Sequence, residues 1–171
     1  MNWFEGQWVL VGGEIGSGKT RFTEKMLPKM IAREGEIAIF DFAPENVSGV
    51  GGKMKIVNNS RMDYYSDNFY APRLTGKDKK EVLLLAELNA QKIERLLAAY
   101  QSRPRDIVVI NDVSIYLQSR TAKQWLSNFY EVDTILANGY YGYYLGSDDF
   151  SQRERQEMEN LMQYQDLVIF L

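Results

Sequence analysis

The chain has 171 residues, of which 45% are hydrophobic and 25% charged, and its formal net charge is −3. This composition excludes the disordered class, and the length suits a single domain covering residues 1–171. Cysteine and histidine are both absent, which excludes disulfides, thiolate chemistry, cysteine-based zinc sites and imidazole catalysis. The net charge does not indicate nucleic-acid binding, and no apolar run is long enough to cross a membrane. We therefore expect a soluble, cytoplasmic protein.

The N-terminal half predicts two strands with a helix between them. Residues 7–11 form a short apolar run that ends at a pair of glycines, which is typical of a buried strand. Apolar residues recur every four positions in residues 19–34 and predict a helix, which its internal proline kinks or shortens. Residues 36–41 predict a second buried strand. A long connection at 43–78 follows, either a functional lid or a surface excursion, and an additional short strand is predicted within it at 53–57.

The C-terminal half predicts further helices and strands in alternation. Apolar positions in helical register mark the helices, and β-branched or tyrosine-rich runs mark the strands. In chain order we expect a helix at 80–100, a strand at 107–110, a helix at 121–137, a strand at 140–145, a helix at 151–163 and a strand at 167–171. Such alternation implies a parallel sheet with helices on both faces. The predicted fold class is a three-layer α/β fold with a mostly parallel sheet of about five strands.

The most specific motif lies between the first strand and the first helix. Eight residues match G-x-x-x-x-G-K-[ST] in full: Gly13, Glu14, Ile15, Gly16, Ser17, Gly18, Lys19 and Thr20. The glycines let the backbone curl around an anion, and the helix N-terminus adds unpaired N–H groups and a positive dipole. In such a loop Lys19 reaches the β- and γ-phosphates, while the Thr20 hydroxyl binds Mg²⁺. The motif therefore predicts a P-loop that binds ATP, or alternatively GTP, with Mg²⁺.

Polar side chains at the ends of two later strands extend the predicted site. Asp112 follows the third strand, where P-loop proteins place the carboxylate that binds Mg²⁺. Asn111 is the alternative, because the sequence does not fix the register at the strand end. Asp41 ends the second strand and is a candidate for binding a substrate hydroxyl or orienting water, together with Glu45, although an ordinary turn aspartate is equally compatible. The predicted catalytic residues are Lys19, Asp41 and Asp112.

Basic and aromatic side chains supply further candidates. Phosphoryl transfer commonly uses an additional arginine or lysine to stabilise the transition state. The candidates for this role are Arg61, Arg120, Arg153 and Arg155. The last two are two positions apart on a predicted helix, so only one of them can face the site. The candidates for stacking on a planar ligand lie in the long connection and are Tyr64, Tyr65, Phe69 and Tyr70.

The P-loop, the strand-end Asn-Asp pair and the alternating strands together resemble the P-loop NTPase superfamily over nearly the whole chain. Within it, residues 11–20 (VGGEIGSGKT) are similar to the double-glycine loop of adenosylcobinamide kinases, and residues 146–171 resemble the final helix and strand of those proteins. The resemblance implies a RecA-type core. That family's guanylyltransferase step uses a histidine, and this chain has none, so the resemblance implies only the kinase half of the activity.

Residues 39–42 (IFDF) are similar to the second strand of RecA-type ATPases. In that group a catalytic glutamate follows the aspartate by two residues, and here the position is occupied by Ala43. The function that we expect is a phosphotransferase that moves the γ-phosphoryl group to a small hydroxyl acceptor. The alternatives are a RecA-type ATPase that acts in a homo-oligomer with an arginine from the neighbouring subunit, and a nucleotide-binding switch with little turnover.

Overall fold

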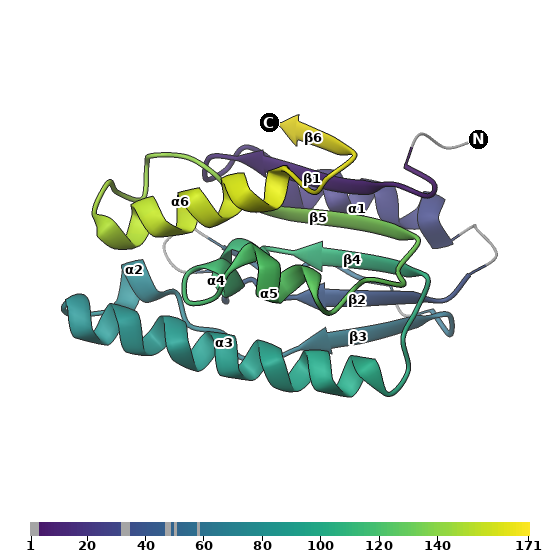
Figure 1. Ribbon diagram of the computed structural model, residues 1–171, viewed down its shortest axis with the longest axis horizontal. Helices are drawn as coiled ribbons and strands as arrows, with labels where there is room; N and C mark the ends of the chain where they lie inside the picture. The colour runs from purple at the N-terminus through teal and green to yellow at the C-terminus, as the bar shows by residue number, and fades with distance from the viewer. Residues whose placement is uncertain (1–3, 32–34, 47–48, 50, 58) are drawn as a thin grey trace.

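The computed structural model describes residues 4–31, 35–46, 49, 51–57 and 59–171. Strands and helices alternate along most of the chain (Figure 1). The strands are β1 (Trp8–Gly13), β2 (Ile37–Asp41), β3 (Met62–Ser66), β4 (Ile107–Asn111), β5 (Thr134–Tyr140) and β6 (Leu167–Phe170). The helices are α1 (Lys19–Ile31), α2 (Pro72–Thr75), α3 (Lys79–Gln101), α4 (Ser114–Leu117), α5 (Ala122–Leu126) and α6 (Asp149–Met162). The last three residues of the helix predicted at 19–34 lie outside the described residues.

The strands form one sheet in the order β3-β2-β4-β5-β1-β6, and every neighbouring pair is parallel. The predicted α/β class and parallel sheet are confirmed, but the strand number was wrong, because the sheet has six strands rather than five. The order places β5 between β1 and β4, so the chain crosses over between sequential strands. Because all strands run the same way, their carboxyl ends lie at one edge of the sheet, where ligands of open α/β sheets bind.

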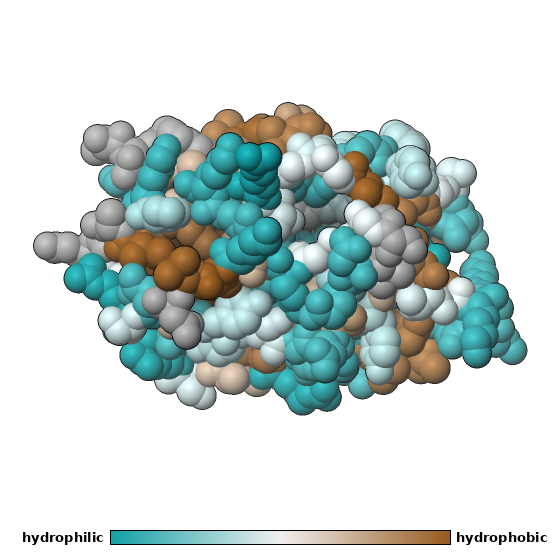
Figure 2. Space-filling model, turned by 180° about the vertical axis from the view of Figure 1, so that it is seen from behind, coloured by the Kyte–Doolittle hydropathy of each residue, from teal (hydrophilic) through white to brown (hydrophobic). Residues whose placement is uncertain are grey.

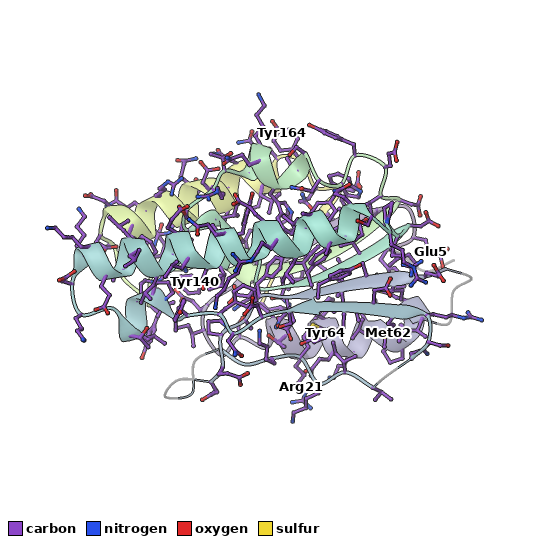
Figure 3. The ribbon with its side chains drawn as sticks, turned by 90° about the horizontal axis from the view of Figure 1, so that it is seen from below. Glu5, Arg21, Met62, Tyr64, Tyr140 and Tyr164 are labelled. Atoms are coloured by element: carbon purple, nitrogen blue, oxygen red, sulfur yellow. The ribbon has the colours of Figure 1, made fainter. Side chains whose placement is uncertain are left out.

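The additional strand was predicted in the wrong place. Residues 53–57 are irregular, and the extra strand is β3, which forms the edge of the sheet next to β2. Its residues are half-buried or exposed, so β3 lacks the continuous apolar run that marks a buried strand. Met62 and Tyr64 lie on the same face of β3 (Figure 3). The described part of the 43–78 connection thus contains both β3 and the short helix α2.

The helix predicted at 121–137 and the strand predicted at 140–145 were also wrong. A capping box of Thr121 and Gln124 starts α5, but this helix ends at Leu126. Phe129 and Val132 lie in the irregular segment that follows, and the later apolar residues belong to β5. β5 pairs with β1 on one side and β4 on the other, and core side chains cover both of its faces, so all its residues are buried. A short apolar run fits a buried strand as well as a helical stripe, and here the space between two strands decides the outcome.

The hydrophobic core lies on both faces of the sheet. On one face, α1 covers β1, β4 and β5, and on the other face α3, α4, α5 and α6 lie in front of the strands (Figure 1). The second of these layers contains a cluster of packed rings whose members are Phe40, Phe42, Tyr100, Trp125 and Phe129. Aromatic rings in such tilted and edge-to-face pairs bury large areas and fix the position of the helices on the sheet.

The surface of the α1 side is mostly polar, with apolar side chains in separate patches rather than one continuous area (Figure 2). Within the described ranges, no helix has the length and apolar character that crossing a membrane requires.

Candidate functional site

The loop between β1 and α1 is an open turn of glycines. Gly16 and Gly18 have φ angles of 72° and 95°, in the left-handed region that favours glycine. A Cβ atom added to either residue would meet nothing within 4 Å, so the space beside both residues is open. Helix α1 begins directly after Gly18, and its first N–H groups have no partners within the helix. The loop is thus an open cradle at a helix N-terminus, an arrangement that binds anions.

Lys19 lies across this cradle. Its Nζ donates hydrogen bonds to the carbonyl oxygens of Gly13 (2.9 Å) and Glu14 (2.6 Å), and more weakly to the Ser17 hydroxyl (3.4 Å). Burial lowers the pKa of Lys19, and the carboxylates of Asp112 and Glu14 oppose this effect. The amine is therefore held at the loop by neutral oxygen atoms of the loop itself, where an arriving anion can replace them.

Five polar residues at the ends of β2, β4 and β5 and on α1 form what we call the strand-end network: Thr20, Thr23, Asp41, Asn111 and Asn138. The Thr20 hydroxyl donates to Asn111 Oδ1 at 3.1 Å, and Asn111 Nδ2 donates to Asp41 at 2.8 Å. Asn138 donates to both Asn111 Oδ1 and Thr23 Oγ1. Of the two strand-end candidates, Asn111 is thus the one that contacts Thr20.

Asp112 lies one residue further, where the chain leaves the sheet. Its φ angle of 63° is unusual for a residue other than glycine, and its N–H donates to the side chain of Asn138. Burial raises the pKa of the Asp112 carboxyl, whereas the Ser114 hydroxyl, Lys19 and Arg73 act to lower it. Backbone strain of this kind is concentrated at functional sites. The strained turn moves the Asp112 carboxylate away from the strand and into the neighbouring pocket.

Asp41 is fully buried and bonded through both carboxylate oxygens. Oδ2 accepts from the Met54 N–H at 2.7 Å and from the Tyr64 hydroxyl at 2.9 Å, while Oδ1 accepts from Asn111 and from the Ala43 N–H. Asp41 is not among the residues that line the pocket. These hydrogen bonds connect Asp41 to Met54 and Tyr64 of the long connection and to Asn111 at the end of β4. The predicted role of Asp41 at a substrate hydroxyl stays a prediction, and no contact supports it.

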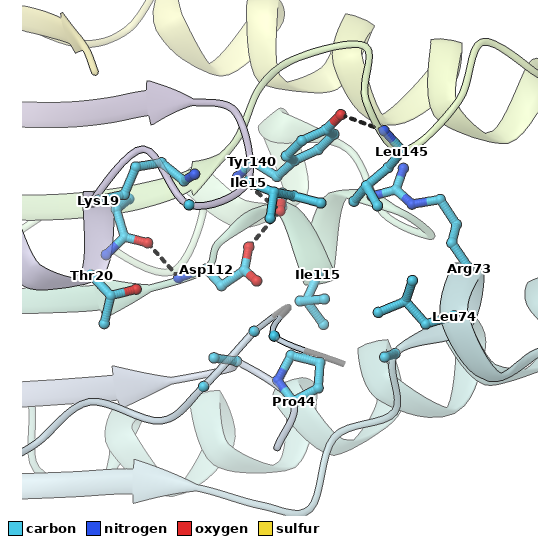
Figure 4. Close-up of a pocket in the computed structure, with 18 of the residues that line it drawn as sticks. Ile15, Lys19, Thr20, Pro44, Arg73, Leu74, Asp112, Ile115, Tyr140 and Leu145 are labelled. Carbon is cyan, nitrogen blue, oxygen red and sulfur yellow. Dashed lines mark hydrogen bonds between the residues drawn. The ribbon is translucent and has the colours of Figure 1, made fainter. Parts of the chain in front are cut away.

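A pocket of about 340 Å³ includes the cradle at one end, because Gly16, Gly18 and Lys19 are among the residues that line it. Figure 4 shows Lys19 and Thr20 at one end, Arg73 and Leu145 at the other, and Asp112 between them. The walls between the two ends are largely apolar and include Ile15, Pro44, Leu74 and Ile115. The cradle and these walls therefore line one continuous pocket.

Arg73 was not predicted as a site residue. It projects from α2, and its guanidinium forms an ion pair with Glu154 at 2.9 Å and lies over the rings of Tyr140 and Phe150. Its side chain is 11% exposed. The local sequence around Arg73 carries no signal, because only the folding of α2 over the carboxyl edge of the sheet brings this arginine to the pocket.

The four arginines proposed from the sequence do not line this pocket. Arg120 pairs with Glu87 and Glu94. Arg153 donates to the carbonyl of Gln118, and Arg155 donates to a loop carbonyl and stacks 3.7 Å from the ring of Tyr143. The exposed Arg61 lies in the turn before β3.

The aromatic residues of the long connection also lie outside the pocket lining. Tyr64 bonds to Asp41, Tyr65 stacks on Phe40, and Phe69 packs against Phe42. The Lys92 amine lies over the ring of Tyr70, 4.6 Å from the ring centroid. The aromatic side chain that does line the pocket is Tyr140, whose hydroxyl accepts from the Leu145 N–H (Figure 4). Ligand stacking by the four predicted rings stays a prediction.

The residues that can hold a metal ion are Thr20 and Asn111, whose side chains are in contact, while the predicted Mg²⁺ role of Asp112, which lines the pocket, stays a prediction. No three acidic side chains gather into a metal-binding group anywhere in the part of the chain that the structure describes. Mg²⁺ commonly keeps its water ligands and binds through few protein groups plus substrate phosphates, which this sparse donor set fits. No family model matches this chain, and no curated protein sequence matches it significantly.

Proposed function

We propose that this protein binds a nucleoside triphosphate with Mg²⁺ in the loop at residues 13–20 and transfers the γ-phosphoryl group to a hydroxyl acceptor in the adjoining pocket. The observation that carries the proposal is the open glycine cradle, with Lys19 across it, at one end of a pocket of about 340 Å³ that extends to Arg73. A binding switch or a hydrolase needs room for the nucleotide alone. A phosphotransferase also needs room for an acceptor beside the γ-phosphate.

The residues of the cradle fit a triphosphate. Its glycines leave room that a side chain would fill, and Lys19 supplies a cation that exchanges carbonyl oxygens for phosphate oxygens. Thr20 offers its hydroxyl to Mg²⁺, and Asn111 holds that hydroxyl at 3.1 Å. When bound, Mg²⁺ supplies neutralisation of the phosphate charge that develops during transfer. The helix dipole of α1 acts in the same direction.

Asp112 is placed to orient the acceptor. One of its carboxylate oxygens accepts from Ser114 at 2.5 Å, and the residue lines the pocket between the cradle and the apolar walls. In the transfer, the acceptor oxygen bonds to the γ-phosphorus as the bond from phosphorus to the β–γ bridging oxygen breaks, which releases the nucleoside diphosphate. The hydroxyl proton passes to the Asp112 carboxylate, whose raised pKa favours accepting it.

The strand-end residues give less support to a hydrolase. Residue 43, where the resembled ATPases carry a catalytic glutamate, is a buried alanine whose N–H donates to Asp41. Glu45, the possible substitute, is exposed to solvent and does not line the pocket. The carboxylate that the pocket does contain, Asp112, is accompanied by apolar walls suited to an organic acceptor rather than to water alone.

The test is isothermal titration of the protein with ATP and GTP, with and without Mg²⁺. Replacing Lys19 by alanine removes a charge-assisted contact to the phosphates, so we expect affinity about 10- to 100-fold lower. Lys25→Ala is the matched control, because Lys25 is an exposed lysine on the same helix. Equal binding by Lys19→Ala and Lys25→Ala, or no binding by the parent protein, would reject the phosphate site.

Turnover is tested next, with phosphate release and phosphoryl transfer followed in the same samples. We expect slow release in the absence of an acceptor, and faster consumption of the triphosphate when a hydroxyl compound that fits the pocket is added. Rapid hydrolysis that depends on protein concentration, and that no acceptor changes, would instead support the oligomeric ATPase.

A further inference from the structure

The end of the pocket remote from the cradle contains a buried group of charged and polar side chains. Arg73 from α2 donates to Glu154 Oε1 of α6 at 3.0 Å, and the two side chains are 11% and 1% exposed. Gln118, at the end of α4, is 3% exposed and lines the pocket. Tyr140, at the end of β5, packs its ring against the guanidinium at 5.2 Å. Arg73 and Gln118 thus line this end of the pocket, and Glu154, which does not line it, is paired with Arg73.

Two buried atoms in this group lack a hydrogen-bond partner among the described residues. They are Gln118 Oε1 and Glu154 Oε2, and the second lies 2.9 Å from the Arg73 guanidinium as an ion-pair contact only. The contact with Arg73 satisfies the Glu154 oxygen, which leaves Gln118 Oε1 as the buried acceptor without a donor, and such an atom costs about 1–3 kcal/mol and requires an explanation. Gln118 lies beside Glu154, close enough for its side chain to lower the pKa of that carboxyl. A proton on Glu154 Oε2, donated to Gln118 Oε1, would give this acceptor a donor.

The surroundings of Glu154 favour such a proton. Burial raises its pKa to about 7, the negative charge of Asp112 acts in the same direction, and Arg73 and Gln118 only partly oppose them. The groups that act on Glu154 are therefore Arg73 of α2, Asp112 after β4 and Gln118 at the end of α4. Once Glu154 is neutral, the positive charge of Arg73 is no longer compensated by its partner.

We propose that Arg73 binds a carboxylate of the acceptor at this end of the pocket. In that state Glu154 is protonated, no longer forms an ion pair with Arg73, and donates a hydrogen bond to Gln118. This inference rests on the proposed function, because it identifies the acceptor of the same site. The acceptor is a hydroxy acid whose hydroxyl lies at Asp112, whose carbon chain contacts Ile115 and Leu74, and whose carboxylate lies at Arg73 (Figure 4).

A carboxylate fits this end better than a phosphate does. The cluster holds one cation, Arg73, and two acidic side chains, Glu154 and Asp112. Because Asp112 also contributes negative charge here, the single charge of a carboxylate costs less in this buried site than the two charges of a phosphate would once Glu154 is neutral. The apolar walls also favour a ligand with one charged end and a hydrocarbon middle.

The test is titration of the full chain with glycolate, ω-hydroxybutanoate and ω-hydroxyhexanoate, with the neutral amide of the best-bound acid as the matched ligand. We expect one acid to bind at least about tenfold more tightly than its amide, because only the acid forms the charge-assisted contact with Arg73. Affinity should weaken as the pH rises from about 6 to about 9, since binding requires a proton on Glu154.

Two variants assign the effect to the residues. Arg73→Gln should bind the acid and the amide equally. Glu154→Gln should bind the acid at high pH at least as tightly as the parent does at low pH, with no pH dependence over this range. The reason is that no charged side chain at position 154 then competes with the ligand for Arg73. Thermal unfolding checks that both variants fold, and if Arg73→Gln does not, Glu154→Gln alone still decides the outcome.

Each result is decisive for this site. Equal affinity for acid and amide, absence of binding by every acid, or the same pH dependence in Glu154→Gln as in the parent would overturn the inference. Titration of the same samples with ATP and Mg²⁺ separates it from the proposed function. ATP binding without acid binding rejects only the carboxylate site, whereas acid binding without ATP binding rejects the phosphotransferase and leaves the carboxylate site in place.

Discussion

Replacing Glu154 by glutamine should change how stability depends on pH. Glu154 is 1% exposed, and burial raises the pKa of its carboxyl from 4.5 to about 7 in the folded protein. Between these values the folded state holds a proton that the unfolded state releases, so the stability of the parent falls as the pH rises. This contribution is fully present below about pH 4.5 and is lost as the pH passes about 7. The substituted glutamine keeps the shape of the side chain but cannot titrate.

The size of the effect follows from the shift. Moving one pKa from 4.5 to about 7 corresponds to about 3 kcal/mol of differential stability. We therefore expect the parent to lose about 3 kcal/mol more than Glu154→Gln between about pH 4.5 and about pH 8, whatever the other groups contribute in common. The difference between the two proteins isolates Glu154, because the remaining titratable groups are the same in both.

Urea unfolding followed by circular dichroism at several pH values measures this difference. Glu87→Gln is the matched control, because hydrogen bonds from Arg120 and Ser119 lower the pKa of Glu87 to about 2, below the range studied. Glu87→Gln should therefore run parallel to the parent across this range. If the parent and Glu154→Gln also remain parallel to within about 0.5 kcal/mol, the buried cluster is not arranged as described and the reasoning fails.

Two further substitutions test the strand-end network and the cradle. Asp41→Ala should destabilise the fold by at least about 2 kcal/mol, because it leaves the buried donors of Met54 and Asn111 without their acceptor; unchanged urea unfolding would contradict the network. Gly18→Ala places a side chain at a φ of 95° and should cost about 1–2 kcal/mol, while the added Cβ crowds the cradle and weakens ATP binding. Gly6→Ala is the control, because Gly6 has a φ of 66° and lies just before β1, at the opposite end of that strand from the cradle. It should cost a similar amount of stability and leave ATP affinity unchanged.

The elements predicted correctly are those with a strong local pattern. The central residues of β1, β2 and β4 form continuous apolar runs, and α3 is a long amphipathic helix. Short-range sequence therefore determines these four elements. β3 was missed because an edge strand needs only backbone pairing and has no continuous apolar run. β5 was predicted as part of a helix because a buried strand and the apolar face of a helix are both rich in apolar residues. Only the positions of β2 and of β1 and β4 decide that these segments become strands.

The candidate site divides in the same way. The glycine turn, Lys19 and the start of α1 are adjacent in the chain, so the motif alone predicts their geometry, and the structure has the turn and the helix in the predicted positions. The phosphate-binding role itself stays a prediction. By contrast, the sequence left Asn111 and Asp112 as alternatives, because a one-residue difference in strand register exchanges them. The structure places Asn111 against Thr20 and Asp112 in the pocket.

Local sequence thus determined the cradle and the buried strands, since glycine conformational freedom and apolar periodicity act over a few neighbouring residues. The tertiary structure alone decided the second half of the pocket. Arg73, Gln118 and Glu154 come from α2, α4 and α6, and they meet because these helices pack over the carboxyl edge of one parallel sheet. A contact between residues 81 positions apart, such as Arg73 with Glu154, leaves no trace in the local pattern of either segment.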